Sequence, residues 1–408
     1  MLARIVAATL AVVAGGCVFD RSGFTPRVDC ESSIAADVST DRTDFGLPAL
    51  ILDGLLDDDG APRPWWDPSW KRRRRLTFLN AGGKQDLVDF PVLVVLDGTR
   101  LDYSAAGMAG EDLRFVDADH ATVLAHEIER WQAGQASHVW VRVPRIDKLS
   151  SQDHIWLYHG NPGAADGQQA ASVWSSAHAG VWHLSGDYDD STKNASHATN
   201  HGAKDAAGEA AGAQAFSGAQ YVELPKAASL DLDAFTVSLW FRSSQTWDEA
   251  DWPGSAMLVT RATSGWCSHD WTVFAGRRDT ESGDAGRVIA GNGACTGTGW
   301  EPRLFSGTGL NDDKWHQVAL VRTPAGDNRL YVDGVEADAL KDDGSSVSAD
   351  RAIQVGGEQH RDNGSYLDGA VDELRVIKGA RSAAWIDADH RSVSDALISY
   401  GPEERYGR

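Results

Sequence analysis

The chain is short of basic residues, and this shortage excludes some classes of partner. Its 408 residues include 38 lysines and arginines against 59 aspartates and glutamates, a formal net charge of −21. A protein that grips a phosphate backbone needs clustered lysine and arginine side chains. We therefore expect no nucleic-acid partner. The acidic excess fits a soluble, calcium-tolerant protein of the cell exterior.

Motifs for catalysis are also missing. The chain has no Gly-x-Ser-x-Gly elbow and no glycine-rich phosphate loop. The segment His126–Arg130 begins as a zinc-protease motif does but lacks the second histidine. A retaining glycosidase needs two closely placed carboxylates, and no sequence pattern marks such a pair. These absences favour a protein that is not an enzyme.

Long apolar runs are absent, and the longest at the N-terminus is too short to span a bilayer. One positive charge, an apolar run and small residues make residues 1–16 a predicted signal peptide. The small residues before Cys17 resemble a bacterial lipoprotein box, which implies a lipid on Cys17 and anchoring in the membrane. Ala14 departs from that motif, and an ordinary signal peptidase could cut the same bond. The expected location is the bacterial cell envelope, as an outer-membrane lipoprotein or a secreted protein.

Cysteine is scarce, with four residues in the chain. Cys267 and Cys295 lie in one glycine-rich excursion, and outside the cytoplasm we expect them to form a disulfide. Two inert thiols are the alternative. Cys30 has no evident partner.

Residues 17–64 lack periodicity and are predicted to form a disordered tether after the lipidated cysteine. Residues 65–168 instead show short strands separated by polar turns, such as Phe90–Leu96 and Val139–Pro144. This spacing predicts an all-β sandwich. The basic run Lys71–Arg75 suggests either contact with an anionic polymer or a solvated edge strand that prevents edge-to-edge pairing. We favour the edge strand.

The block at residues 65–168 resembles the bacterial DUF2341 family. The matching stretches are the opening Trp70–Arg73, the stretch Asp112–Phe115, the strand Val139–Pro144 and the ending Tyr158–Asn161. The resemblance implies a secreted module placed beside lectin-like domains and implies no known reaction.

Residues 177–395 are organised around a strand pair at Asp313–Arg322 and Asn328–Val332, which ends in the turn pair Asp333-Gly334. These stretches resemble the hairpin of LamG-like jelly rolls of the concanavalin A-like lectin/glucanase fold. The expected fold class is therefore all-β, with two β-sandwich domains of which the C-terminal one is a jelly roll. Residues 396–408 are expected to form a tail.

Two candidate sites are expected in this domain, one implied by the resemblance and one indicated by the tryptophans. In related jelly rolls, an aspartate of the first loop and one of the last strand bind Ca²⁺, which by position would be Asp190 and Asp372. Hydrogen bonding within the turn by the same side chains is the alternative. A glycan surface is the second site, because loop tryptophans beside polar groups can stack on sugar rings. Its candidate residues are Trp247, Trp252, Trp266 and Trp300, although packing under long loops would also explain them.

The expected function is non-catalytic binding at the cell surface, of a glycan or a surface glycoprotein, with possible help from calcium. A structural or adhesive envelope protein that binds protein partners is the first alternative. A divergent polysaccharide-degrading enzyme is the second, although the Glu-x-Asp-x-x-Glu stretch usual in jelly-roll enzymes is missing. Nothing in the sequence sets the ligand or the oligomeric state.

Overall fold

The computed structural model of the protein describes residues 64–247, 256–261, 271–276, 286–292, 303–347, 351–357 and 365–407. The predicted signal peptide, Cys17, Cys30, Cys267 and Cys295 lie outside the described residues, so those predictions stay as they are. Nearly all regular structure in the described part is antiparallel β-sheet, which confirms the all-β prediction. Among the described residues, no helix combines the length and apolar character that crossing a membrane requires.

The first domain is a sandwich of a five-stranded and a three-stranded sheet. The first sheet has the strand order β23-β1-β7-β3-β4 and the second the order β2-β6-β5. Leu76, Phe90, Phe115 and Leu157 are among the buried side chains between them. The strands are β1 (Arg72–Phe78), β2 (Leu87–Leu96), β3 (Arg114–Asp117), β4 (Val123–Leu124), β5 (His126–Arg130), β6 (Ser137–Ile146), β7 (His154–His159) and β23 (Ile398–Arg405).

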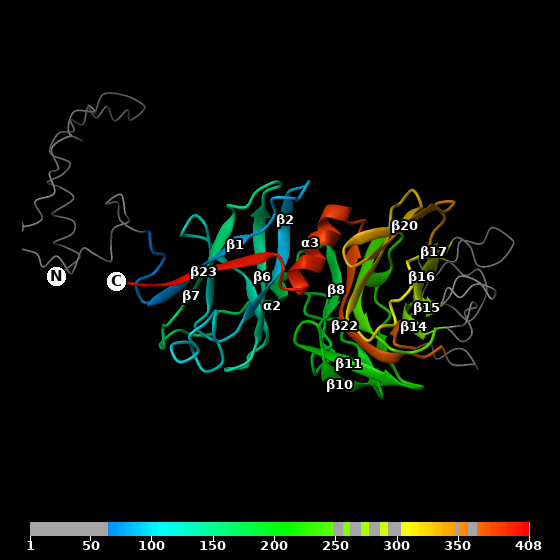
Figure 1. Ribbon diagram of the computed structural model, residues 1–408, viewed down its shortest axis with the longest axis horizontal. Helices are drawn as coiled ribbons and strands as arrows, with labels where there is room; N and C mark the ends of the chain where they lie inside the picture. Colours follow the sequence, from blue (N-terminus) through cyan, green and yellow to red (C-terminus); the bar gives the residue numbers. More distant parts are fainter. Residues whose placement is uncertain are drawn as a thin grey trace, which may run out of the picture. The chain divides into compact units, whose positions relative to one another are not determined.

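The last strand of the chain returns to the first domain, where it lies along β1 (Figure 1). The expectation of a tail at residues 396–408 is thus corrected, because residues 398–405 pair with β1. The favoured interpretation of Lys71–Arg75 as an edge strand is also wrong, since β1 pairs with β23 on one side and β7 on the other. The arginines of β1 meet glutamates of β23: Arg72 contacts Glu403 at 2.9 Å and Arg73 contacts Glu404 at 2.7 Å.

The second domain is a jelly roll of an eight-stranded and a seven-stranded sheet. The larger sheet has the order β10-β11-β22-β13-β18-β19-β20, with β8 added beside β22, and the smaller has the order β17-β16-β15-β14-β21-β12-β9. The strands are β8 (His178–Trp182), β9 (Thr199–His201), β10 (Lys204–Ala207), β11 (Gly212–Ser217), β12 (Tyr221–Leu224), β13 (Phe235–Arg242), β14 (Ala256–Thr260), β15 (Trp271–Gly276), β16 (Arg287–Asn292), β17 (Arg303–Phe305), β18 (His316–Arg322), β19 (Asp327–Val332), β20 (Val335–Lys341), β21 (Ile353–Val355) and β22 (Asp368–Lys378).

The hairpin predicted from the sequence is present as β18, β19 and β20. Asp333 and Gly334 connect β19 to β20 with φ values of 48° and 77°. Positive φ at both central positions is the geometry that a tight two-residue hairpin turn needs, which explains the Asp-Gly pair.

Helix α3 (Ala383–Val393) packs the two domains together. Ser382 caps its N-terminus by accepting a hydrogen bond from the Trp385 amide. Trp385 meets Phe90 of β2 edge to face at 5.4 Å, and the Leu93 amide donates to Ser392 Oγ at 2.9 Å. Residues 64–406 consequently form one compact unit.

The buried arginine of β1 generates the first prediction. The Arg73 side chain is 4% exposed, pairs with Glu404 and lies 3.9 Å from the Trp156 ring and 4.4 Å from the Trp65 ring. Arg73→Ala should lower the free energy of unfolding in urea by about 2 kcal/mol, because it removes a buried side chain that packs against two tryptophan rings and pairs with Glu404. Arg75→Ala, on the same strand, is the matched control and should cost less than about 1 kcal/mol. Equal losses for both variants would contradict a special role for Arg73.

Candidate functional site

A polar cleft of about 360 Å³ opens where the first domain meets the start of the jelly roll. One wall comes from β5 and from the short helix α2 (Ala170–Val173), and the other from the connection between β8 and β9. Most of the lining side chains carry hydrogen-bonding groups. They are Glu127, Glu129, His183, Ser185, Asp187, Asp189, Asp190, Ser191, Thr192 and His197, with Ile128, Ala170 and Ala171 as the apolar part.

A β-bulge in β22 supplies carboxylates behind this cleft. Arg375 faces Ser238 of β13 and Asp372 faces Trp240, so two residues of β22 oppose a single residue of β13. Glu373 lies in the bulge with φ at +50°, a region that non-glycine residues seldom adopt.

The bulge interrupts the alternation of faces along β22. Val371 and Leu374 are both in the jelly-roll core, although they are three residues apart. The residues between them, Asp372 and Glu373, are therefore turned away from that core and toward the first domain. There Arg375 lies 4.5 Å from the Trp140 ring of β6.

A second bulge places Glu129. In β5, Ile128 faces Val139 of β6 and Arg130 faces His138, which leaves Glu129 without an opposing residue. Its carboxylate accepts a hydrogen bond from Trp140 Nε1 at 2.9 Å. Bulges of this kind redirect side chains and are over-represented beside functional sites.

His183 stands among three glutamates. Its Nδ1 lies 2.6 Å from Glu373 Oε1 and 3.6 Å from Glu129 Oε2, and its Nε2 lies 3.6 Å from Glu127 Oε2. Glu127 and Glu129 come from β5, His183 directly follows β8, and Glu373 comes from β22. The cluster is thus built by both domains.

Burial and the neighbouring charges shift the pKa values of the groups in and beside this cluster. Burial raises the pKa of Glu129 to about 8, and the charge of Glu373 adds to the rise. Burial also raises the pKa of Asp372 well above its ordinary value. Burial alone would lower the pKa of His183, but Glu373, Glu129 and Glu127 outweigh it and hold that pKa well above its ordinary value.

The junction holds more negative than positive groups. Glu373 Oε2 accepts a 2.7 Å hydrogen bond from Arg375 Nη2, and Arg375 Nη1 also pairs with Asp389. Together with Glu127, Glu129 and Asp372, five buried carboxylates face two cationic side chains, His183 and Arg375. Uncompensated buried charge is costly, so protons or a bound cation must balance the excess.

The two predicted calcium ligands are buried in separate hydrogen-bond networks. Asp190 accepts hydrogen bonds from its own loop and from β8, at Oδ1 from the Val181 and Thr192 amides and at Oδ2 from Thr192 Oγ1 and the Ser196 amide. Asp372 Oδ2 accepts from the Glu209 and Ala210 amides at 2.8 and 3.0 Å. Asp372 Oδ1 is buried and has no partner among the described residues.

The tryptophan prediction is corrected at one position. Trp247 is 2% exposed and packs against Phe241 with ring centroids 5.9 Å apart, so it belongs to the core and presents no face to a sugar. Trp252, Trp266 and Trp300 lie outside the described residues.

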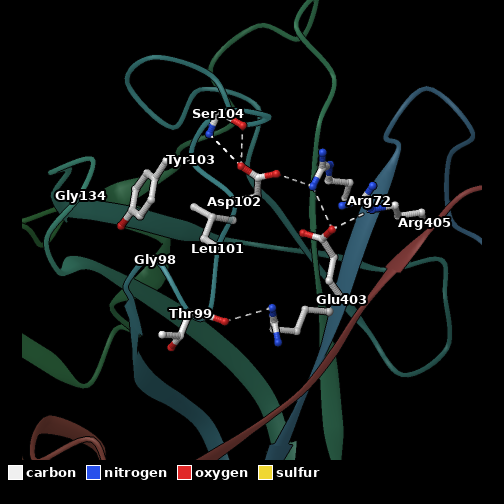
Figure 2. A pocket seen from close by; sticks show the side chains of 11 residues that line it. Arg72, Gly98, Thr99, Leu101, Asp102, Tyr103, Ser104, Gly134, Glu403 and Arg405 are labelled. Atoms are coloured by element: carbon white, nitrogen blue, oxygen red, sulfur yellow. Dashed lines mark hydrogen bonds and ion pairs between the residues drawn. The ribbon is translucent and has the colours of Figure 1, made fainter.

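A second cleft, of about 480 Å³, lies in the first domain near the β1–β23 pair (Figure 2). Two of its three arginines are paired with its two carboxylates: Arg72 with Asp102 at 2.7 Å and Glu403 at 2.9 Å, and Arg405 with Glu403 at 3.1 Å. The third, Arg74, donates to the Gly401 and Thr99 carbonyls. Tyr103 donates to Leu96 O at 2.7 Å. These side chains are already used within the domain, which makes this cleft the weaker candidate.

Sequence reasoning singled out Asp190 and Asp372 but did not assign Glu127, Glu129, His183 and Glu373 to a site. The signal for the glutamates was present, because residues 127 and 129 alternate on a strand and so share a face. His183 and Glu373 carried no comparable signal, since their approach depends on the packing of two domains.

Comparisons with known proteins divide the chain in the same order. The sequence model of DUF2341, a domain of unknown function, matches residues 109–200, and that of the concanavalin A-like lectin/glucanases superfamily matches residues 216–387. The chain therefore carries a DUF2341 domain followed by a concanavalin A-like domain, as the resemblance predicts. Glu127, Glu129 and His183 fall within the first match, and Glu373 falls within the second. A comparison with curated proteins finds no match.

Several solved structures are similar at low identity. Domain 4 of AbnA, an extracellular arabinanase from Geobacillus stearothermophilus, in complex with arabinotriose, has 18% identity and a TM-score of 0.39, with 52% of this chain and 97% of that one covered. The binding domain of Paraclostridial Mosquitocidal Protein 1 has 12% identity and a TM-score of 0.39, with 50% and 49% covered. The binding domain of Botulinum Neurotoxin DC in complex with SialylT has 10% identity and a TM-score of 0.41, with 53% and 52% covered. The chain spans about half the length of these two toxin domains.

The raised pKa of Glu129 generates the second prediction. Its folded-state pKa of about 8 exceeds the unfolded value of 4.5, so the charged form opposes folding. Its contribution to stability is complete below pH 4.5 and is lost as the pH rises toward 8. Glu129→Gln should therefore gain stability over the wild type across this window, by up to about 1.4 kcal/mol per pH unit. Urea unfolding of chelator-treated protein at several pH values measures the difference.

The control for this experiment is Glu336→Gln, on the exposed strand β20. Its stability should follow the wild type through the same pH window. A constant difference between Glu129→Gln and the wild type from pH 4.5 to 8 would refute the burial-driven shift.

Proposed function

We propose that this protein is a non-catalytic binding protein of the bacterial cell envelope that recognises a glycan or a glycoprotein in the cleft beside the jelly roll. The observation that carries the proposal is the lining of the cleft, which is rich in carboxylate, hydroxyl and imidazole groups and has a small apolar part. The concanavalin A-like domain matched at residues 216–387 supports it from the neighbouring part of the chain, while the lining residues themselves, 127–197, fall within the DUF2341 match. The envelope location rests on the lipoprotein-like N-terminus.

Acceptors at the cleft mouth suit sugar hydroxyls. The Asp189 side chain is 73% exposed and pairs with His197 at 2.9 Å, while Ser191 and Thr192 follow on the same loop. Charged acceptors form the stronger hydrogen bonds with hydroxyl donors, and a few well-placed polar groups set specificity in such sites.

The loop that carries these acceptors is held in place from the first domain. Glu127 accepts from Ser191 Oγ at 2.7 Å and from Trp174 Nε1 at 2.8 Å. The acceptors are consequently positioned before a ligand arrives, which reduces the cost of ordering them on binding.

Calcium at Asp190 and Asp372 remains part of the proposal as an ion that shapes the loop. The buried Asp372 Oδ1, which lacks a partner among the described residues, is the oxygen best able to accept a cation. Both oxygens of Asp190 already accept hydrogen bonds, which calcium would have to replace.

Hydrolysis of a polysaccharide is the second candidate. Its support is the divided pKa pair in the cleft: burial raises the pKa of Glu129, whereas the nearby His183 imidazole holds the pKa of Glu127 below its ordinary value despite burial. Binding is favoured because the Glu129 side chain is 2% exposed, which leaves a glycosidic oxygen little access. Reducing-sugar release that disappears in Glu129→Gln would reverse this order.

A glycan array probed with the purified protein, first with calcium and then with a chelator, tests the binding proposal. We expect a defined set of glycans to bind, and the double variant Asp187→Asn/Asp189→Asn to bind them at least about tenfold more weakly, because it loses charged acceptors. Asp343→Asn, an exposed acidic residue outside the cleft, is the matched control and should bind as the wild type does. Loss of binding with the chelator would support the calcium part.

Silence of the folded protein on the array in both conditions would overturn the glycan proposal. Capture of one envelope protein under those conditions would instead favour the adhesive role.

A further inference from the structure

We propose that Glu129, His183 and Glu373 bind a divalent transition-metal ion of the zinc class at the junction of the two domains. One potential ligand atom from each residue lies within 4.8 Å of the others, and among the described residues this is the group that fulfils the condition. The site differs from the calcium pair Asp190 and Asp372 in both residues and metal class. It also stands independently of glycan binding.

The spacing is close to what a small ion needs. Zinc bonds of about 2.0–2.1 Å in a tetrahedral arrangement place neighbouring ligand atoms about 3.3 Å apart. His183 Nδ1 is 3.6 Å from Glu129 Oε2 and 2.6 Å from Glu373 Oε1. Of these two contacts, the shorter one, now a hydrogen bond, has to widen to admit the ion.

Trp140 and Arg375 each hold one oxygen of a carboxylate ligand, and in Glu129 the held oxygen, Oε2, is also the one that lies 3.6 Å from His183 Nδ1. Trp140 Nε1 donates to Glu129 Oε2, and Glu129 Oε1 is buried without a hydrogen-bond partner among the described residues. Arg375 Nη2 donates to Glu373 Oε2, and Glu373 Oε1 faces the imidazole. An unpartnered oxygen on a side chain that is 2% exposed is costly, and a metal ion would satisfy it.

The histidine has the outer partner that a metal-binding imidazole requires. With Nδ1 on the ion, Nε2 keeps its proton, and Glu127 Oε2, now 3.6 Å away, becomes its acceptor after a small approach. Glu127 is itself fixed by Trp174 and Ser191. A carboxylate behind the imidazole fixes the tautomer and strengthens the ligand, an arrangement typical of metal sites.

Charge and ligand type select the ion. The excess of five carboxylates over two cationic side chains at the junction favours a dication over a neutral ligand. Calcium takes oxygen ligands, whereas an imidazole nitrogen with two carboxylates suits zinc and its first-row neighbours. Glu129 and His183 also line the cleft, which leaves space for a water molecule as a fourth ligand.

Titration of the chelator-stripped protein with Zn²⁺, and separately with Co²⁺, tests the proposal. We expect one equivalent of Zn²⁺ to bind with heat in calorimetry and to raise the melting temperature. Co²⁺ should give visible d–d bands without the near-ultraviolet sulfur charge-transfer band that cysteine ligation would add. Glu129→Gln should weaken the binding of both ions at least about tenfold, the loss expected from one metal ligand.

Asp189→Asn is the matched control, because it lines the same cleft but lies outside the three-residue cluster. It should retain metal binding while it weakens glycan binding. Glu129→Gln keeps the shape of the side chain, and its urea unfolding confirms that it is folded. Absence of Zn²⁺ binding to the wild type, or equal affinity in wild type and Glu129→Gln, would overturn the metal site. Failure on the glycan array with normal Zn²⁺ binding would overturn the proposed function alone.

Discussion

The burial of carboxylates where the two domains meet is the constraint on which the rest of the structure depends. Glu373 and Asp372 turn away from the jelly-roll core, and Glu129 approaches from the first domain. Charged groups in such a place are stable only when each is paired, protonated or bound to a cation. His183 and Arg375 supply part of the compensation. The arrangement of these side chains therefore requires residues from both domains.

The strands that carry these side chains have irregular backbone geometry. Glu129 and Glu373 both occupy β-bulges, and Glu373 does so at a φ of +50°. Leu184, the residue after His183, also has a positive φ, of 59°. Strain of this kind persists only where surrounding contacts fix it, and it gathers at functional sites. Positive φ at Glu373 and Leu184, together with the bulge at Glu129, argues for a purpose beyond packing.

Much of the fold could be predicted from the sequence because it depends on local signals. The Asp333-Gly334 turn and the apolar run of β18 identify the jelly-roll hairpin by residue type alone. The pairing of β23 with β1 could not be predicted. The sequence Ile398–Arg405 does not indicate which strand it pairs with, apart from glutamates that complement the arginines of the distant strand β1. Trp247 was wrongly predicted to lie on a glycan surface, because the sequence of a loop-rich segment does not reveal which side chains are buried.

The candidate site was harder to predict because bulges break the alternation on which strand prediction depends. A regular β22 would place Asp372 and Glu373 on opposite faces, but the bulge turns both from the core. Asp190 of the cleft lining and Asp372 behind it were singled out in advance, but as calcium ligands. The remaining groups meet because α3 and β23 tie the jelly roll back to the first domain. A jelly roll that is joined to the first domain before β8 and again after α3 is restricted in its movement, and such restriction is what a metal or sugar site needs to keep its ligands in place.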